Sequence, residues 1–306
     1  MKYLVTGGFG FIGSHITEYL VNRGDNVVVL DNFNTGKEKN LEKVIDKIEF
    51  FKGDILDYDL LKKITKDVDG VFHEAALASV QQSFDNPEEY HNVNVNGTEN
   101  VLKLAKQFGF KVVYASSSSV YGNPKNIPIK EQDEKNPINP YAVSKLKDEE
   151  LAINYSKMGV SVIGLRYFNV FGIRQSKEYA GVIKLFLERI RNKLPPKING
   201  DGTQFRDFVH VSDVVKANIL AMESDVNHSF FNVGTNSSIS ILELANTVIE
   251  SAGLDIEPIH GPALPGDVHK TLADIQLIKE KISWTPSIRI ENWIKEIITS
   301  NKIDEV

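Results

Sequence analysis

Residues 2–13 read KYLVTGGFGFIG, and this stretch decides the fold. A strand-like run over residues 2–6 leads directly into Gly7, Gly10 and Gly13, in the spacing G-x-x-G-x-x-G. Glycines at these places let the turn tighten, let the backbone approach a pyrophosphate and let the next helix pack closely on the strand. The stretch therefore predicts a strand, a turn and a helix whose N-terminus binds a dinucleotide. Taken alone, the motif is also compatible with a glycine-rich turn that binds nothing.

Strand-like runs and helical stretches alternate through the first half of the chain. After residues 2–6, short apolar runs predict strands over residues 27–31, 48–52, 70–73, 112–116 and 160–166. Between them, helices are predicted over residues 11–22, 56–66, 87–108 and 140–158. Strand and helix in repeated alternation, joined by right-handed crossovers, predict an α/β fold with a doubly wound parallel sheet of the Rossmann type.

The alternation of strands and helices becomes less regular after Phe171, where Pro195-Pro196 and a glycine-rich turn over residues 199–202 interrupt the pattern. Helices are expected over residues 181–191, 212–223 and 240–252, and two short ones around Trp284. The helix at 240–252 opens with a capping box, Ser240-x-x-Glu243. We expect residues 1–170 to form a dinucleotide-binding domain, with segments around 207–235 returning to it. Residues 171–306 should form mainly a smaller C-terminal α/β domain for the substrate.

Composition excludes several classes of protein. The net charge of −6 leaves no overall basic field to collect nucleic acid, so an anionic ligand must be bound by local groups. The chain has no cysteine, which excludes disulfides and thiolate metal sites, and no His cluster has the spacing of metal ligands. We found no signal peptide and no apolar run of about 18 residues. We therefore expect a cytoplasmic protein with neither a metal nor a membrane partner.

The ends of the later strands carry further candidates for cofactor contacts. Asp31 ends the second predicted strand, where an acidic side chain accepts hydrogen bonds from both ribose hydroxyls and repels a 2′-phosphate. This arrangement favours NAD over NADP. Asp54 and Ile55 follow the third strand, near the expected adenine position, and Ala75-Ala76 leave room for the cofactor after the fourth. Each of these last two segments is equally compatible with a plain loop.

The segment Tyr141-Ala142-Val143-Ser144-Lys145 contains a candidate general base. Residues i and i+4 share one face of a helix, so the phenol and the ammonium point the same way. A nearby cation favours the phenolate, which lets a tyrosine act as a base near neutral pH. On its own such a pair is more typical of an exposed helix face. Here it follows a serine run at the carboxyl end of the fifth strand, the edge where α/β sheets bind ligands.

Together these segments carry a family resemblance. With HEAA at residues 73–76, NVNGT at 94–98 and LRYFNVFG at 165–172, the chain resembles the extended short-chain dehydrogenase/reductases. Within them it is most similar to the NAD-dependent nucleotide-sugar epimerases of the UDP-glucose 4-epimerase type. The resemblance spans nearly the whole chain and includes GDGTQFRDFVHVSDV at 200–214 and PGDVHKTLAD at 265–274.

The resemblance implies a mechanism and a set of site residues. Tyr141 would take the proton of the sugar 4-hydroxyl while hydride passes from C4 to the nicotinamide; the 4-keto sugar then turns over and recovers hydride on its other face. Lys145 would hold the nicotinamide ribose and lower the tyrosine pKa, and Ser117 would hydrogen-bond the 4-oxygen. The implied cofactor contacts are Gly7, Gly10, Phe11, Ile12, Gly13, Asp31, Asn32, Asp54, Ile55, Ala75, Ala76, Asn94, Tyr141 and Lys145. The implied substrate contacts are Ser117, Tyr141, Asn169, Arg206 and Thr271.

Related enzymes with other activities leave alternatives open. Dehydratases and decarboxylases of this superfamily place acidic residues directly after the catalytic hydroxyl, and this chain reads Ser117-Ser118-Ser119 instead. Epimerisation of a UDP-hexose is therefore preferred to a lyase reaction. A non-catalytic NAD-binding protein is the third possibility. The resemblance also implies a homodimer built on the helices predicted at 87–108 and 140–158.

The substrate side departs from the family pattern at one place. Arg206 should pair with the diphosphate, although an ion pair with a neighbouring aspartate is its structural alternative, and Asn169 could instead be a turn-forming residue. The family commonly has a second phosphate-binding arginine where this chain has Leu264. We hypothesise that Arg174, Lys184 or His269 compensates.

The predicted sugar specificity depends on Thr271. It lies near a position where some family members carry a bulky tyrosine that closes the pocket around C2. Threonine is smaller, so we expect UDP-GlcNAc and UDP-GalNAc to be accepted as well as UDP-glucose and UDP-galactose.

Overall fold

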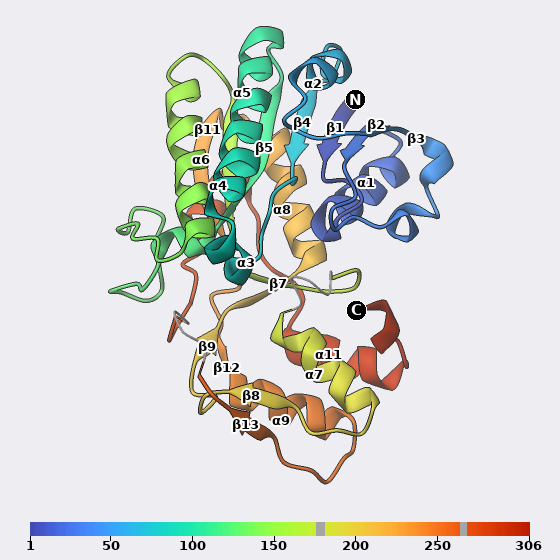
Figure 1. Ribbon diagram of the computed structural model, residues 1–306, viewed down its shortest axis with the longest axis vertical. Coiled ribbons are helices and arrows are strands. Elements are labelled where there is room, and N and C mark those ends of the chain that lie inside the picture. The colour runs from blue at the N-terminus through green and yellow to red at the C-terminus, as the bar shows by residue number, and fades with distance from the viewer. Residues whose placement is uncertain (176–180, 264–267) are drawn as a thin grey trace.

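The computed structural model describes residues 1–175, 181–263 and 268–306. This part of the chain contains a seven-stranded parallel sheet with the strand order β11-β6-β5-β4-β1-β2-β3 (Figure 1). Its strands are β1 (Lys2–Thr6), β2 (Asn26–Asp31), β3 (Ile48–Lys52), β4 (Gly70–His73), β5 (Lys111–Ser117), β6 (Val162–Tyr167) and β11 (His228–Val233). The chain runs outward from β1 to β3 and then returns to the other side of β1. The doubly wound parallel sheet is thus confirmed, and β11 adds a strand that we did not predict.

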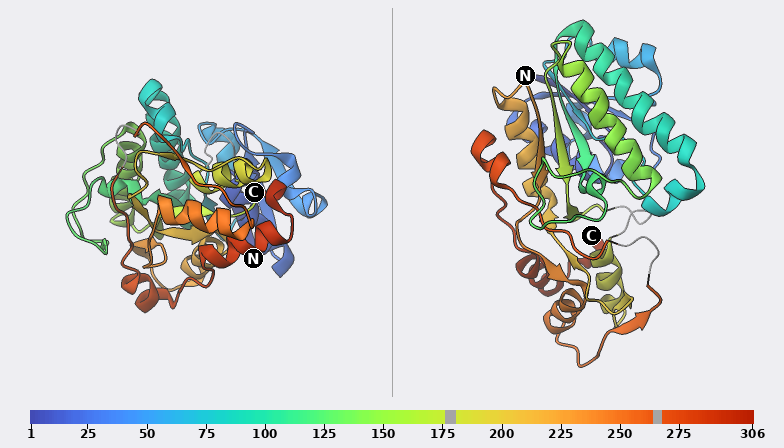
Figure 2. Two further views of the ribbon diagram at one scale, coloured as in Figure 1. Left: turned by 90° about the horizontal axis from the view of Figure 1, so that it is seen from below. Right: turned by 90° about the vertical axis from the view of Figure 1, so that its left-hand side faces the viewer.

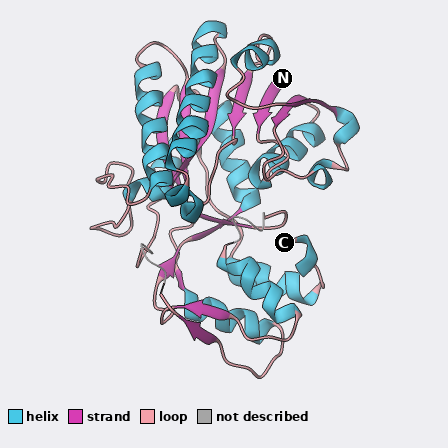
Figure 3. Ribbon diagram, in the orientation of Figure 1, coloured by secondary structure: helices cyan, strands magenta, loops and turns pink. Residues whose placement is uncertain are grey.

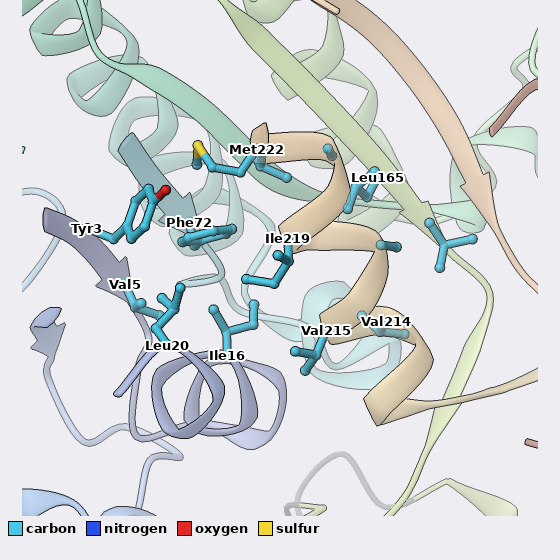
Figure 4. Packing of buried hydrophobic residues seen from close by; sticks show 14 of the residues in the cluster. Tyr3, Val5, Ile16, Leu20, Phe72, Leu165, Val214, Val215, Ile219 and Met222 are labelled. Carbon is cyan, nitrogen blue, oxygen red and sulfur yellow. The ribbon is translucent and has the colours of Figure 1, made fainter. Parts of the chain in front are cut away.

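Helices cover both faces of the sheet (Figures 1 and 2). On one face lie α1 (Phe11–Arg23) and α8 (Val211–Glu223). Their apolar side chains meet those of β1 and β4 in a core that includes Val5, Phe72, Ile16, Leu20 and Ile219 (Figure 4). Because side chains alternate along a strand, Leu4 points to the opposite face and packs in a second core. That face is covered by α2 (Tyr58–Ile64), α5 (Gly97–Phe108) and α6 (Pro140–Ser156).

The helix predicted over residues 87–108 is interrupted by a wider turn. It begins as α4 (Pro87–Tyr90), continues as a π-helical segment over His91–Asn96 and becomes α5. Its end is as predicted, since Gly109 adopts a left-handed conformation with φ of 83°. The π turn contains Asn94, whose side chain bonds the backbone of Leu77 through both its oxygen and its nitrogen, at 2.8 and 3.0 Å.

A smaller layer of helices and short strands lies beyond the carboxyl ends of the sheet strands (Figure 3). It contains α7 (Val182–Arg191), β8 (Lys197–Asn199), β9 (Phe205–Arg206), β12 (Ile239–Ser240), α9 (Ile241–Ser251), β13 (Ile259–Gly261) and α11 (Ile290–Thr299). These elements share a hydrophobic core of their own, in which Phe186, Leu187, Leu244 and Ile294 are fully buried. The capping box predicted at Ser240 is confirmed at the start of α9.

Short elements connect the two layers. The strands β7 (Asn169–Phe171) and β10 (Phe208–His210) pair in parallel between the large sheet and the smaller layer (Figure 1). The remaining helices are α3 (Val80–Asp85) and α10 (Gln276–Ile282), with single 3-10 turns at Glu38–Leu41, Ile45–Lys47, Ser118–Tyr121 and Ile303–Glu305. Of the helices in the described ranges, none has the length and apolar character needed to cross a bilayer.

Candidate active site

A cleft of about 360 Å³ opens at the carboxyl ends of the sheet strands. Its walls include the glycine turn after β1, the ends of β2 to β6 and the start of α6. The strand order reverses between β1 and β4, which is where doubly wound sheets bind ligands. Except for Asn94, every residue predicted to contact the cofactor lines this cleft.

The glycine turn forms a cradle that side chains would fill. Gly7 has φ of 66°, and a Cβ placed on it would lie 2.9 Å from the Ala75 backbone. A Cβ on Gly13 would lie 2.2 Å from the Gly7 carbonyl oxygen, because α1 packs directly against the turn. Gly10 precedes α1 without a capping side chain, and the first turn of α1 carries no acidic residue. The first amides of α1 are therefore available to an anion, which fits the pyrophosphate of a dinucleotide.

Asp31 is held at the end of β2 by two backbone amides. Its Oδ2 accepts from Phe9 N at 2.9 Å and its Oδ1 accepts from Phe33 N at 2.7 Å. Burial raises the pKa of the carboxyl, and the two N–H donors oppose that rise. Each oxygen keeps a second lone pair, so the fixed carboxylate can still accept from ribose hydroxyls. Beside it, Asn32 Nδ2 donates to Asp54 Oδ2 at 2.8 Å and links the ends of β2 and β3.

Asn94 has a structural position behind the cleft. In addition to its two bonds with Leu77, its Nδ2 donates to Ser144 Oγ at 2.9 Å, and its side chain is buried. It therefore ties the loop after β4 to α6, the helix that carries Tyr141 and Lys145.

The three predicted catalytic residues all line the cleft. Ser117 ends β5, while Tyr141 and Lys145 lie one turn apart at the start of α6. The helix begins where it does because Asn139 Oδ1 accepts from Ala142 N at 2.8 Å and Pro140 occupies the first position. The cap therefore fixes the register that puts Tyr141 and Lys145 on the cleft side.

Two strands clamp α6 through a buried charged group. Glu149 accepts from Ser116 Oγ at 2.7 Å, and Arg166 donates to both of its oxygens at 2.7 Å. The Arg166 and Glu149 side chains are 2% and 3% exposed. Since Ser116 directly precedes Ser117, this clamp ties α6, which carries Tyr141 and Lys145, to the end of the strand that carries Ser117.

Two carboxyl groups near the predicted catalytic residues were not predicted from the sequence: Asp148, which is buried, and Glu74, which is partly buried. Asp148 Oδ2 lies 3.2 Å from Lys145 Nζ. Burial raises the pKa of Asp148, and the Lys145 charge opposes the rise. Glu74 accepts from Tyr167 OH at 3.0 Å, and burial raises its pKa to about 7. Two features of the sequence could have pointed to these carboxyl groups. Asp148 lies one helical turn after Lys145, and Glu74 belongs to the HEAA motif.

Of the predicted substrate residues, Ser117 and Tyr141 line the cleft, whereas Asn169, Arg206 and Thr271 lie together around residues 205–207 and do not line it. Asn169 Nδ2 donates to the Asp207 carbonyl oxygen at 3.0 Å. Thr271 N donates to the Phe205 carbonyl oxygen at 3.2 Å, and Thr271 Oγ1 accepts from Asp207 N at 3.5 Å. Arg206 itself borders a second cavity of about 350 Å³, formed with the loop before β12 and the start of α11.

Two of the three candidates to replace a phosphate-binding arginine have other contacts. Arg174 pairs with Glu18 on α1, at 2.5 Å. Lys184 donates to the carbonyl oxygens of Gln175 and Val306, at 2.7 and 2.5 Å. His269 is exposed, and its carbonyl oxygen lies 3.5 Å from Arg206 Nη1. Leu264 lies outside the described residues.

A comparison with protein-family models found one family. Its description is the NAD dependent epimerase/dehydratase family, and the model matches residues 3–234. The match contains the glycine turn, the serine run, Tyr141, Lys145 and Arg206.

Individual relatives cover almost the whole chain. A putative UDP-glucose 4-epimerase from Methanocaldococcus jannaschii is 39% identical over 96% of each chain. A UDP-glucuronic acid decarboxylase from Arabidopsis thaliana is 35% identical over 98% of this chain and 69% of its own. Among solved structures, the UDP-N-acetylglucosamine 4-epimerase of Methanobrevibacter ruminantium, in complex with UDP-N-acetylmuramic acid, superposes with a TM-score of 0.94. That structure is 38% identical, and the match covers 99% of this chain and 98% of its own.

Proposed function

The chain belongs to the NAD-dependent epimerase/dehydratase family, and we propose that it catalyses the 4-epimerisation of a UDP-hexose. The observation that carries the proposal is the convergence of Ser117, Tyr141 and Lys145 on the cleft that holds the glycine turn and Asp31. NAD is the cofactor of the family. The uncapped N-terminus of α1, the glycine cradle and the Asp31 carboxylate supply the three contacts that a dinucleotide requires.

Each catalytic side chain has a defined task in this proposal. Bound NAD supplies a nicotinamide ring that accepts hydride from C4 and returns it. Tyr141 removes the proton from the 4-hydroxyl and gives it back, and Lys145 lies one turn later on the same helix, α6. Ser117 hydrogen-bonds the 4-oxygen and Lys145 holds the nicotinamide ribose. Arg206 pairs with the substrate diphosphate, as its guanidinium binds two phosphate oxygens at once.

A lyase reaction is the second candidate, favoured by the decarboxylase relative. In the described residues, the carboxylates that line the cleft are Asp31, Asp54 and Glu74, and none of them follows Ser117 along the chain. Positions 118 and 119, where lyases of the superfamily carry acids, are serines. This absence of an acid beside the catalytic hydroxyl supports epimerisation.

One incubation separates the candidate functions. The purified protein is mixed with UDP-galactose, and in parallel with UDP-glucuronate, without added NAD, and the sugar products are identified. We expect UDP-glucose from the first substrate. A keto sugar or a pentose would indicate a lyase, and the absence of any product a non-catalytic NAD-binding protein.

We propose that the enzyme also accepts the 2-acetamido sugars UDP-GlcNAc and UDP-GalNAc. The small Thr271 side chain and the UDP-N-acetylglucosamine 4-epimerase among the structural neighbours support this. Thr271→Tyr should lower the activity on UDP-GlcNAc relative to that on UDP-glucose. An unchanged ratio of the two activities would contradict the assignment of Thr271.

We further propose that the enzyme is a homodimer and that its two layers divide the ligands. Residues 1–170, with 207–235, would hold the cofactor, and most of 171–306 the sugar nucleotide; the separate core of the smaller layer supports the division. Phe84, Val143 and Ile153 are 54%, 43% and 37% exposed along α3 and α6, which supports a partner on that face. Sedimentation equilibrium should give twice the chain mass, and Val143→Glu should give the chain mass.

A further inference from the structure

The ammonium of Lys145 is almost fully buried. Its side chain is 4% exposed and forms an ion pair with Asp148, which is fully buried, at 3.2 Å between Nζ and Oδ2. A buried ammonium without a counter-charge gives up its proton easily, because loss of water disfavours the charged form. The task of Lys145 in the proposed function requires that charge, so what maintains it matters for the reaction.

Asp148 is connected to β1 by a line of buried side chains. Burial raises the pKa of Asp148 to about 7, and the Lys145 charge and a hydrogen bond from the Thr98 side chain on α5 oppose the rise. His73 at the end of β4 lies between two threonines, with Nε2 3.0 Å from Thr98 Oγ1 and Nδ1 2.7 Å from Thr6 Oγ1. Burial lowers the pKa of His73 to about 3, so the ring is neutral.

The partners determine which nitrogen of His73 carries the proton. A neutral imidazole has one donor and one acceptor. Because the Thr98 hydroxyl donates to Asp148, it accepts from Nε2–H, and Nδ1 then accepts from the Thr6 hydroxyl. Thr6 Oγ1 in turn accepts from Ala75 N at 3.3 Å. With this assignment every donor in the line points toward Asp148 and opposes the effect of burial on its carboxyl, whose Oδ1 has no hydrogen-bond partner of its own among the described residues.

Other titratable groups face the pair from the elements packed around it. They are His73 at the end of β4, Glu74 in the loop after it, Tyr114 from β5, and Tyr141 and Glu149 from α6 itself. Glu149 is paired with Arg166, and Glu74 accepts from Tyr167. Among the described residues, Asp148 is thus the carboxyl that contacts the Lys145 ammonium.

We propose that Asp148 is a positioning residue, the counter-ion that keeps Lys145 protonated and fixed in the cleft, and that Thr98 and His73 orient it. This inference rests on the proposed function, because it concerns the state that Lys145 must have there. It adds to that function a line of side chains that runs from the residue before the glycine turn to the catalytic lysine.

The test measures the pKa of the Lys145 ammonium directly. Nitrogen NMR of protein labelled in its lysine side chains follows each Nζ through a pH titration, and Lys145→Arg assigns the signal. Asp148→Asn removes the negative charge and keeps an oxygen acceptor of the same shape. We expect it to lower the pKa of Lys145 by more than about one pH unit. An unchanged pKa in the folded variant would overturn the proposal.

The same helix offers a matched control. Lys147 and Glu150 have the same three-residue spacing, with Nζ 2.8 Å from Oε2, but their side chains are 49% and 53% exposed. Glu150→Gln should therefore change the pKa of Lys147 by much less than Asp148→Asn changes that of Lys145. Equal shifts in the two variants would mean that burial gives Asp148 no special role.

A second variant tests the line of side chains and covers the case in which Asp148→Asn does not fold. Thr98→Val keeps the shape and removes the donor, and should lower the pKa of Lys145 in the same direction by a smaller amount. No change would contradict the orienting role of Thr98.

The titration does not require that the protein turn over a substrate. A lower pKa in a protein that forms no epimer would uphold the inference and contradict the proposed function, and an unchanged pKa in an active epimerase would do the reverse.

Discussion

Glu149 accepts a hydrogen bond from Ser116 at 2.7 Å, and this contact joins α6, the helix that carries Tyr141 and Lys145, to the strand that ends at Ser117. The same carboxylate binds the buried guanidinium of Arg166 through both of its oxygens. The proposed catalytic residues are therefore held in place by an ion pair that does not line the cleft. Its contribution is to stability and to the geometry of the site.

Glu149→Gln should destabilise the protein strongly. The change leaves the Arg166 charge buried without its partner, which costs about 3 kcal/mol or more in the free energy of unfolding. Denaturant unfolding of the variant and of the wild type measures this difference. The exposed pair of Lys125 and Glu134 is the control, and Glu134→Gln should leave the free energy of unfolding unchanged. Similar effects of the two changes would contradict the clamp.

Tyr141→Phe should lower kcat by a factor of about 10² to 10⁴, because it removes the general base and leaves the rest of the cleft in place. The amount of NAD bound by the purified variant should stay close to that of the wild type, since the side chain loses a single oxygen. Steady-state kinetics and cofactor content measured on the same sample check both expectations. A variant with full activity would exclude Tyr141 as the base.

Gly13→Ala should abolish tight cofactor binding. The new Cβ would lie 2.2 Å from the Gly7 carbonyl oxygen, so the turn and α1 must move apart. We expect the NAD content of the purified protein to fall at least about tenfold, as the pyrophosphate cradle opens. Gly24→Ala is the control, because its φ of 93° strains an alanine in the backbone at the C-terminal end of the same helix, but no atom lies within 4 Å of its Cβ position and it is far from the cradle in sequence. If the two variants retained equal amounts of NAD, the assignment of the glycine turn as the pyrophosphate site would be contradicted.

The Glu74 carboxyl should make stability depend on pH. Burial raises its pKa from 4.5 to about 7, so the folded protein binds this proton more tightly than the unfolded chain does. Its stabilising contribution is therefore fully present below pH 4.5 and is lost as the pH rises to about 7. Relative to the wild type, Glu74→Gln should gain about 3 kcal/mol over this range. Chemical unfolding of both proteins at several pH values gives the difference in their free energies of unfolding. If this difference did not change with pH, the raised pKa of Glu74 would be ruled out.

The features of the fold and the site that depend on neighbouring residues could be predicted from the sequence. The glycine turn follows from the spacing of three glycines, and the Tyr141 and Lys145 pair from helix periodicity, so both were found in the cleft. The strand β11 was missed, because its pairing with β6 depends on residues more than sixty positions away. The π turn at Asn94 was not predicted for a similar reason, since its contacts with Leu77 and Ser144 are tertiary.

Long-range packing also explains what was missed in the site. No periodicity shows that Asp148 is fully buried, because that depends on α5 and the sheet closing over one face of α6. For Arg174 and Lys184, the sequence did not show the contacts that they make in the fold. Arg174 contacts Glu18 and Lys184 contacts backbone carbonyl oxygens, and these partners lie far from them along the chain or become close only through folding.

The fate of the hydrogen at C4 tests the central claim most directly. UDP-galactose that carries deuterium at C4 is incubated with the purified enzyme in ordinary water, without added NAD. If hydride leaves C4 and returns to the same carbon within one closed site, UDP-glucose will form and will retain the deuterium at C4. Formation of UDP-glucose without the label, or no epimer at all, would contradict the account.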